Sequence, residues 1–236
     1  MISHNLQLLS HRIKQACAAA DRALDEVTLL AVSKTFGFDA VREAAACGQF
    51  RFGENYVQEA LDKMDALRDA RASGGQGLEW HLIGPLQSNK TRPVAERFDW
   101  VHSVDRLKIA QRLSEQRPAG LPPLNVLVQV NTSGEDSKSG ADPAEAPALA
   151  RAIALLPRLR LRGLMALPAP SPDEAAQHAA HHGLKTLFDT LRADGLPLDT
   201  LSMGMSADLE AAIAEGATMV RVGTAIFGGR TYHSPP

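Results

Sequence analysis

The chain has 236 residues, a formal net charge of -2 at pH 7 and a composition that is 44% hydrophobic. This length and composition indicate a globular core of one large or two small domains. Neither nucleic acid nor an anionic membrane surface is expected as a partner, because positive charge is not in excess. No apolar run approaches the roughly 18 residues of a membrane span, and residues 1–20 lack the apolar block of a signal peptide, so a cytoplasmic location is expected.

Eight short runs along the chain have the composition of β-strands. They cover residues 27–34, 50–56, 79–84, 99–104, 125–131, 161–167, 200–206 and 219–228. Helix-like stretches lie between them, including residues 39–47, 57–71, 106–117, 143–156, 173–192 and 208–215. Eight strand-plus-helix units predict an α/β fold, a single (β/α)8 barrel of the TIM type, with residues 2–20 as an extra N-terminal helix. Little length remains for more, so residues 1–236 are expected to form one domain.

Polar residues stand where several of the predicted strands end. In a (β/α)8 barrel the chemistry lies at these carboxyl ends, and phosphate groups commonly bind after strands seven and eight. Lys34 closes the apolar run VTLLAVSK, where its amine is expected to be partly desolvated and nucleophilic. Backbone N–H groups in turns and at helix starts can bind a phosphate. The other candidates at strand ends are Glu54, Asn55, Ser206, Gly223 and Thr224.

Arg221 interrupts the otherwise apolar segment MVRVGTAIF. Strand alternation places it on the same face as Met219 and Gly223, next to part of the expected phosphate site. If that face points into the barrel, the guanidinium needs a partner, because an unpaired buried charge costs several kcal/mol. The partner is either an acceptor atom of a cofactor or a carboxylate from a neighbouring strand or helix.

A strand-end lysine, two phosphate-binding turns and a buried arginine fit pyridoxal 5'-phosphate (PLP). The lysine would bind its aldehyde, the two turns its phosphate and the arginine its ring nitrogen. A class I aldolase acting on a sugar phosphate also uses a barrel lysine beside a phosphate site. The segment GPLQSNKT at residues 84–91 is close to a P-loop, but Asn89 replaces the second glycine of that motif, which disfavours nucleotide hydrolysis.

Several separated segments carry a resemblance to a known family. They are LLAVSKT, RFGENYVQEA, WHLIGPLQSNK, GLMALP and LSMGMSADLEAAIAEGATMVRVGTAIFG, between Leu29 and Gly229. Together they closely resemble the pyridoxal phosphate homeostasis proteins, also called the YggS/PROSC family. The resemblance implies a fold-type III PLP barrel, similar to the N-terminal domain of alanine racemase. It further implies a protein that holds PLP as a lysine aldimine and acts in PLP homeostasis as a carrier, buffer or regulator.

The resemblance also implies a role for each candidate side chain. Lys34 would be the Schiff-base lysine, Arg221 would face the ring nitrogen and Asn55 would lie beside the cofactor. After the lysine, family members often read KTKP whereas this chain reads KTFG, which leaves the conformation of that loop open. The residues that would bind the phosphate are Ser206, Gly223 and Thr224.

An arginine at the ring nitrogen argues against efficient catalysis. Its fixed positive charge disfavours protonation of the pyridine, and an unprotonated ring is a poorer electron sink. A racemase of this fold also needs a second acid/base, which in alanine racemase is a tyrosine from the C-terminal domain of a partner subunit. The tyrosines here are Tyr56 and Tyr232. We therefore expect a non-catalytic, monomeric PLP-binding protein that docks apo PLP-dependent enzymes transiently, with a weak PLP-dependent amino-acid racemase as the alternative.

No metal site is expected. Cys17 and Cys47 lack metal-ligand spacing, and a solvated helix face is the expected environment of His178, His181 and His182.

Two further residues have roles that the sequence leaves open. His81 either lines the pocket or is a satisfied core histidine, and Lys138 either offers a second amine near the site or is a solvated loop lysine.

Overall fold

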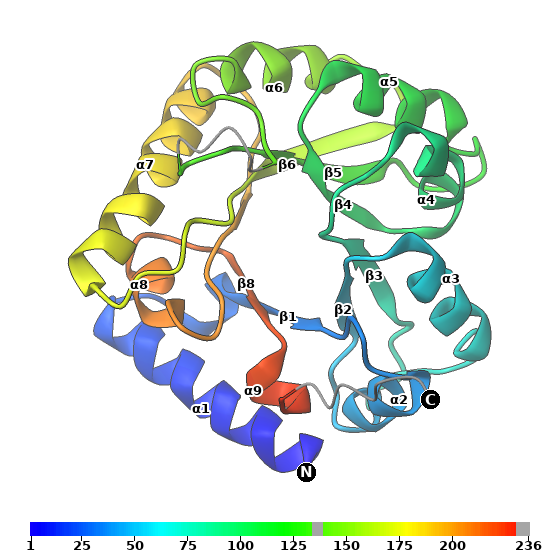
Figure 1. Cartoon of the computed structure of the whole chain (residues 1–236), viewed down its shortest axis with the longest axis vertical. Helices are drawn as coiled ribbons and strands as arrows, with labels where there is room; N and C mark the ends of the chain where they lie inside the picture. The colour runs from blue at the N-terminus through cyan, green and yellow to red at the C-terminus, as the bar shows by residue number, and fades with distance from the viewer. Residues whose placement is uncertain (134–138, 230–236) are drawn as a thin grey trace, which may run out of the picture.

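Eight parallel strands close into a barrel in the computed structural model of the chain, which describes residues 1–133 and 139–229 (Figure 1). The strands follow one another around the barrel in chain order, and β1 pairs with β8 to close it. The predicted (β/α)8 architecture is therefore confirmed. The strands are β1 (Thr28–Val32), β2 (Arg51–Glu54), β3 (Glu79–Leu82), β4 (Trp100–Val104), β5 (Leu124–Gln129), β6 (Leu159–Met165), β7 (Thr200–Ser202) and β8 (Met219–Val222).

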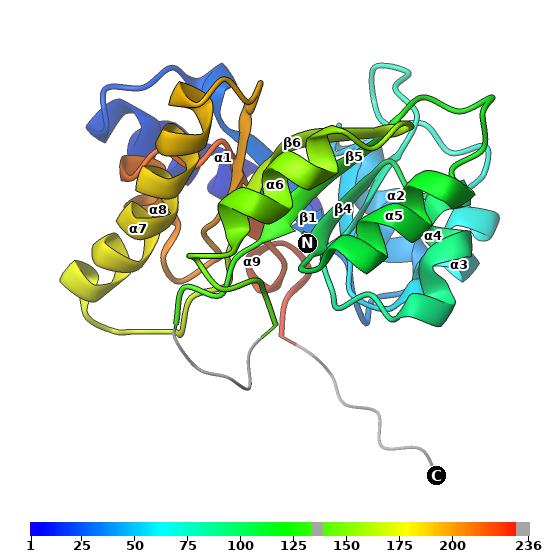
Figure 2. The same ribbon diagram turned by 90° about the horizontal axis from the view of Figure 1, so that it is seen from above.

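Helices surround the barrel on its outside (Figures 1 and 2). The extra N-terminal helix, α1, packs against α2, α8 and α9, and the Asn5 side chain donates a hydrogen bond to Ile226 O at 2.9 Å. Among the described residues, no helix is long and apolar enough to cross a bilayer. The helices are α1 (Ile2–Ala19), α2 (Phe38–Ala46), α3 (Val57–Ala66), α4 (Thr91–Arg97), α5 (Leu107–Gln116), α6 (Ala146–Ala154), α7 (Glu174–Ala193), α8 (Leu209–Ala214) and α9 (Thr224–Phe227).

The two C-terminal strands are shorter than the sequence pattern predicts. The expected strand over residues 219–228 ends at Val222, and the apolar segment that follows forms the helical turn α9. An apolar run alone does not distinguish a buried strand from a buried helix, and here Ile226 and Phe227 are buried in helical form. The predicted strand over residues 200–206 ends at Ser202, since Gly204 adopts a φ of +91° that strands do not use.

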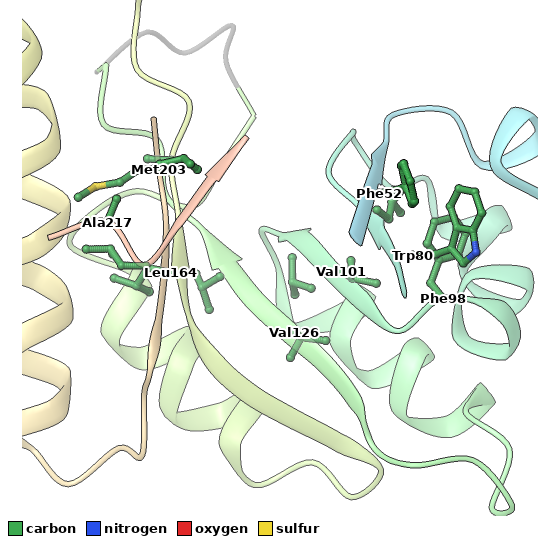
Figure 3. Close-up of a cluster of buried hydrophobic side chains, with 14 of the residues drawn as sticks. Phe52, Trp80, Phe98, Val101, Val126, Leu164, Met203 and Ala217 are labelled. Carbon is green, nitrogen blue, oxygen red and sulfur yellow. The ribbon is translucent and has the colours of Figure 1, made fainter. Parts of the chain in front are cut away.

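Apolar side chains fill two separate regions, as strand alternation requires. The larger region lies between the barrel and its helices; Figure 3 shows Phe52, Trp80 and Phe98 gathered at one part of it. The Phe52 and Trp80 rings lie 5.8 Å apart. Two smaller clusters lie inside the barrel. One consists of Leu30, Val32, Ile83 and Met219, and the other of Trp100, Leu127 and Met165. Because Met219 is inside, Arg221, two residues further along β8, also points into the barrel, so the face that the sequence left open is the inner one.

Gly163 permits the close approach of β6 to β7. It pairs with Thr200, and a Cβ atom at this position would lie 1.7 Å from Thr200 O. We expect Gly163→Ala to lower the free energy of unfolding by about 2 kcal/mol or more, because the short strand β7 would have to move. Urea denaturation measures this change.

Gly183 provides the matched control for that substitution. It lies within α7, where an added Cβ would meet nothing within 4 Å. Gly183→Ala is expected to stabilise the protein by about 0.5–1 kcal/mol, because alanine is the better helix former. Equal stabilities for the two variants would show that the β6–β7 approach does not require glycine.

Candidate functional site

A cavity of about 310 Å³ opens at the end of the barrel that carries the carboxyl ends of the strands. All six residues to which the family resemblance gives a role line it, although they come from four different strand ends. Its remaining lining is apolar and consists of Val32, Ile83, Leu167, Met205 and Ala207. The six predicted residues are Lys34, Asn55, Ser206, Arg221, Gly223 and Thr224.

A second cavity, of about 360 Å³, lies at the opposite end of the barrel. Four of its charged side chains already pair with one another. Arg51 Nε donates to Glu79 Oε1 at 3.1 Å, and Arg162 Nε donates to Asp199 Oδ1 at 2.7 Å. Because these charges are satisfied, the cavity at the carboxyl ends is the better candidate for a ligand site.

The loop that carries Lys34 is anchored on both sides of this residue. Ser33 N donates to Gly53 O at 3.0 Å, and Thr35 N donates to Glu59 Oε1 at 2.6 Å. Thr35 has a φ of +69°, a left-handed conformation that is strained for a β-branched residue. The Phe36 ring lies 5.1 Å from the Phe227 ring. These contacts define the loop that the unusual KTFG sequence left open, and they present Lys34 half-buried at the cavity.

A buried ion pair supports this loop from behind. Lys63 Nζ donates to Glu54 Oε1 at 2.7 Å, to Glu59 Oε1 at 2.6 Å and to Ser33 O at 2.8 Å. Ser33 Oγ also donates to Glu54 Oε1 at 2.6 Å. Burial raises the pKa of Glu54, while the charge of Lys63 opposes that rise.

Glu54 ends the second predicted strand and is for that reason a candidate site residue, but the structure places it outside the cavity lining. Alternation explains this difference, since Asn55 points into the barrel and Glu54 points to the opposite face. Nothing in the sequence around Lys63 indicated that its amine would contact both Ser33, after β1, and Glu54, at the end of β2.

Arg221 is buried and donates two hydrogen bonds inside the barrel. Nη1 donates to Ser202 Oγ at 2.8 Å and Nη2 donates to Ala166 O at 2.9 Å. One acceptor is a hydroxyl and the other is a backbone carbonyl, so neither of these two hydrogen bonds goes to a carboxylate from a neighbouring strand or helix. Burial lowers the pKa of Arg221 to about 10, and the charge of Asp208 opposes that change. The guanidinium is therefore a cation at neutral pH, and it has five N–H donors in all.

The two turns at the other side of the cavity are held by contacts of their own. Arg12 Nη1 donates to Ser206 O at 2.9 Å and thereby ties α1 to this loop. Met205 N donates to Asp208 Oδ1 at 2.6 Å. At the end of β8, a Cβ on Gly223 would lie 2.9 Å from Val32 O, so glycine allows this strand end to approach β1 closely. The backbone at both turns is thus fixed beside the cavity.

His81 does not line the cavity and is a satisfied core histidine. Its Nδ1 lies 2.9 Å from His102 Nε2 and its Nε2 lies 2.8 Å from Glu79 Oε1. Lys138 lies outside the described residues. The segment that resembled a P-loop buries Thr91, whose hydroxyl donates to Ser88 O at 2.9 Å.

The predicted solvated face of the three helical histidines is wrong in part. His181 is buried against Asp208, with 3.0 Å between Nε2 and Oδ2, and both other histidines contact Glu215. The helix packs against α8, and these carboxylates come from the two residues that flank α8 in the chain. Within residues 1–133 and 139–229, no group of three or more side chains is arranged to hold a metal ion.

Comparison with known proteins defines the class first. Residues 4–231 match the family described as alanine racemase, N-terminal domain, and the chain belongs to that family. Alanine racemase of Clostridium difficile 630 shares the fold, with a TM-score of 0.74 at 16% identity; the match covers 98% of this chain and 58% of the racemase.

Nearer relatives identify the branch within this class. The pyridoxal phosphate homeostasis protein of Pseudomonas aeruginosa is 62% identical over 99% of this chain and 98% of its own length. The protein of the same name from Escherichia coli K12 is 56% identical, covering 98% and 97% respectively. The structure of PipY from Synechococcus elongatus with PLP bound has a TM-score of 0.83 at 37% identity and covers 97% and 100% of the two chains. The chain belongs to the family of pyridoxal phosphate homeostasis proteins.

The support behind the Lys34 loop can be tested by removing its cation. Lys63→Met leaves the carboxyl group of Glu54 buried without its cationic partner. We therefore expect a loss of about 3 kcal/mol in the free energy of unfolding, measured by urea denaturation. The double variant Glu54→Gln/Lys63→Met leaves no buried charge and is expected to recover most of that loss. A single variant as stable as the wild type would contradict the role given to this ion pair.

Proposed function

We propose that this protein binds PLP reversibly at Lys34 and acts in intracellular PLP homeostasis as a carrier or buffer. One observation carries the proposal: a single cavity brings together Lys34, the buried cation of Arg221 and two turns of small residues. The names of the relatives and the PLP bound to PipY support the same cofactor.

The side chains present in the cavity fit PLP group by group. PLP supplies an aldehyde that condenses reversibly with an amine and releases water. Lys34 is the amine at the cavity, and the remaining N–H groups of Arg221 are donors for a ring nitrogen. The volume of about 310 Å³ suits a small ligand. In this proposal Asn55 lies beside the ring, and the phosphate is bound by Ser206, Gly223 and Thr224.

The same site favours holding the cofactor over turning substrates over. The positive charge of Arg221 opposes proton uptake at a ring nitrogen beside it, which weakens the ring as an electron sink. Tyr56 is 57% exposed and is absent from the residues that line the cavity. Tyr232 lies outside the described residues. No described tyrosine therefore stands at the cavity as a second acid/base.

The cofactor and its anchor can be tested together with borohydride. Wild-type protein loaded with PLP is expected to show a visible absorption band that borohydride removes, leaving a reduced pyridoxyl group on Lys34 in the peptide mass spectrum. Lys34→Ala should show neither, whereas Lys108→Ala, which removes an exposed lysine from α5, should behave as the wild type. A wild-type protein that cannot be loaded with PLP would contradict the proposal, and a label on a different lysine would contradict the anchor.

The absence of efficient turnover is a separate prediction. In deuterated water, the loaded protein is expected to exchange the α-proton of alanine no faster than free PLP does, because the ring nitrogen beside Arg221 stays unprotonated. Proton NMR measures the exchange. Rapid exchange with inversion of the amino acid would favour the racemase alternative.

A further inference from the structure

A chain of hydrogen-bonding groups crosses the inside of the barrel from the candidate cofactor site to its opposite end. Arg221 Nη1 lies 2.8 Å from Ser202 Oγ, which in turn lies 3.1 Å from His102 Nδ1. His102 Nε2 lies 2.9 Å from His81 Nδ1, and His81 Nε2 lies 2.8 Å from Glu79 Oε1. These groups come from four strands, β8, β7, β4 and β3. The chain therefore exists only because the barrel is closed.

The two ends of this chain determine the direction of every hydrogen bond in it. A guanidinium can only donate, so Ser202 Oγ accepts from Arg221, and an ionised Glu79 can only accept, so His81 carries its hydrogen on Nε2. In a neutral ring, His81 Nδ1 then accepts from His102 Nε2–H, and this leaves His102 Nδ1 to accept the hydrogen of Ser202. At the far end, Glu79 accepts from His81 Nε2. Each group donates away from Arg221, and both histidines have the Nε2–H tautomer.

The charges around the chain favour neutral histidines. Burial holds the pKa of His102 well below its ordinary value, and the charges of His81 and Arg221 lower it further. Burial also lowers the pKa of His81, although the hydrogen bond with Glu79 opposes that change. The Glu79 carboxyl group also accepts from Arg51 at the solvent-facing mouth of the barrel. An ionised Glu79 at this mouth therefore remains the acceptor at the end of the chain.

We propose that Ser202 and His102 are positioning residues, which hold the guanidinium of Arg221 toward the cofactor ring through a one-way chain of hydrogen bonds that ends at Glu79. The proposal rests on the proposed function, since the ring is what Arg221 faces when PLP is bound. Because the hydroxyl hydrogen of Ser202 is engaged by His102, Ser202 presents only lone pairs to Nη1. With Ala166 O accepting from Nη2, two atoms of the planar guanidinium are fixed and its orientation follows.

The tautomers can be tested in the wild-type protein without any cofactor. Long-range 15N–1H NMR distinguishes Nε2–H, Nδ1–H and doubly protonated imidazole rings. At neutral pH, His81 and His102 are expected to be neutral Nε2–H tautomers. A His102 ring with hydrogen on Nδ1, or a doubly protonated ring, would overturn the proposed direction of the chain. This result does not depend on PLP, so it judges the chain even if the proposed function fails.

The positioning role requires a loaded protein and a matched pair of variants. Ser202→Ala removes the hydroxyl that joins Arg221 to His102, and we expect it to weaken PLP binding about tenfold and to give mixed tautomers of His102. It should also shift the pH at which the absorption band of bound PLP titrates. Ser103→Ala removes a buried hydroxyl that has no hydrogen-bond partner among the described residues, and it is expected to change none of these quantities.

Equal PLP affinities and equal titration curves for the two serine variants would overturn the positioning role. A wild type that binds no PLP would overturn the proposed function instead. Should Ser202→Ala fail to fold, a comparison of the wild-type tautomers with and without PLP still decides the matter: the Nε2–H tautomers are expected in both states, and their loss on loading would overturn the proposal.

Discussion

The buried charge of Arg221 is the constraint on which the interior of this barrel depends. A guanidinium out of contact with water must find acceptors, because the protein interior screens charge poorly. Ser202 and Ala166 supply two of them, and neither brings a neutralising negative charge. The positive charge therefore remains directed at the cavity. Leu30, Ile83 and Met219 form an apolar cluster inside the same barrel.

The two lysines near the site have different surroundings. Lys63 has three N–H donors and three acceptors at 2.6 to 2.8 Å, so its amine is fully occupied in holding the chain together. Lys34 lies half-buried at the edge of the cavity, on a loop that Lys63 supports through Ser33 and Glu59. Lys63 therefore supports the loop that presents Lys34 to the cavity.

Sequence patterns predicted the positions that depend on local order. Strand-plus-helix repetition predicted the barrel, and strand ends predicted which segments would supply Lys34, Asn55 and Ser206 to one cavity. Alternation along β8 placed Arg221 on the same face as Met219, and the closed sheet turns that face inward. The prediction that Glu54 belongs to the site is wrong. Glu54 is the last residue of β2, directly before Asn55, but its side chain faces the helices. The position of a strand end predicts which end of the barrel a residue lies at. Whether its side chain points inward or outward depends on the register of the closed sheet.

Local sequence order was enough to predict the repeat of strands and helices, the lysine at the first strand end and the small residues at the last two strand ends. These features depend on neighbours within a few residues along the chain. Only the tertiary structure decided that Ser202 and Ala166 accept from Arg221, that His81 is a core residue, and that Lys63 supports the Lys34 loop. Each of these contacts joins different parts of the chain, and barrel closure and helix packing bring their partners within hydrogen-bonding distance.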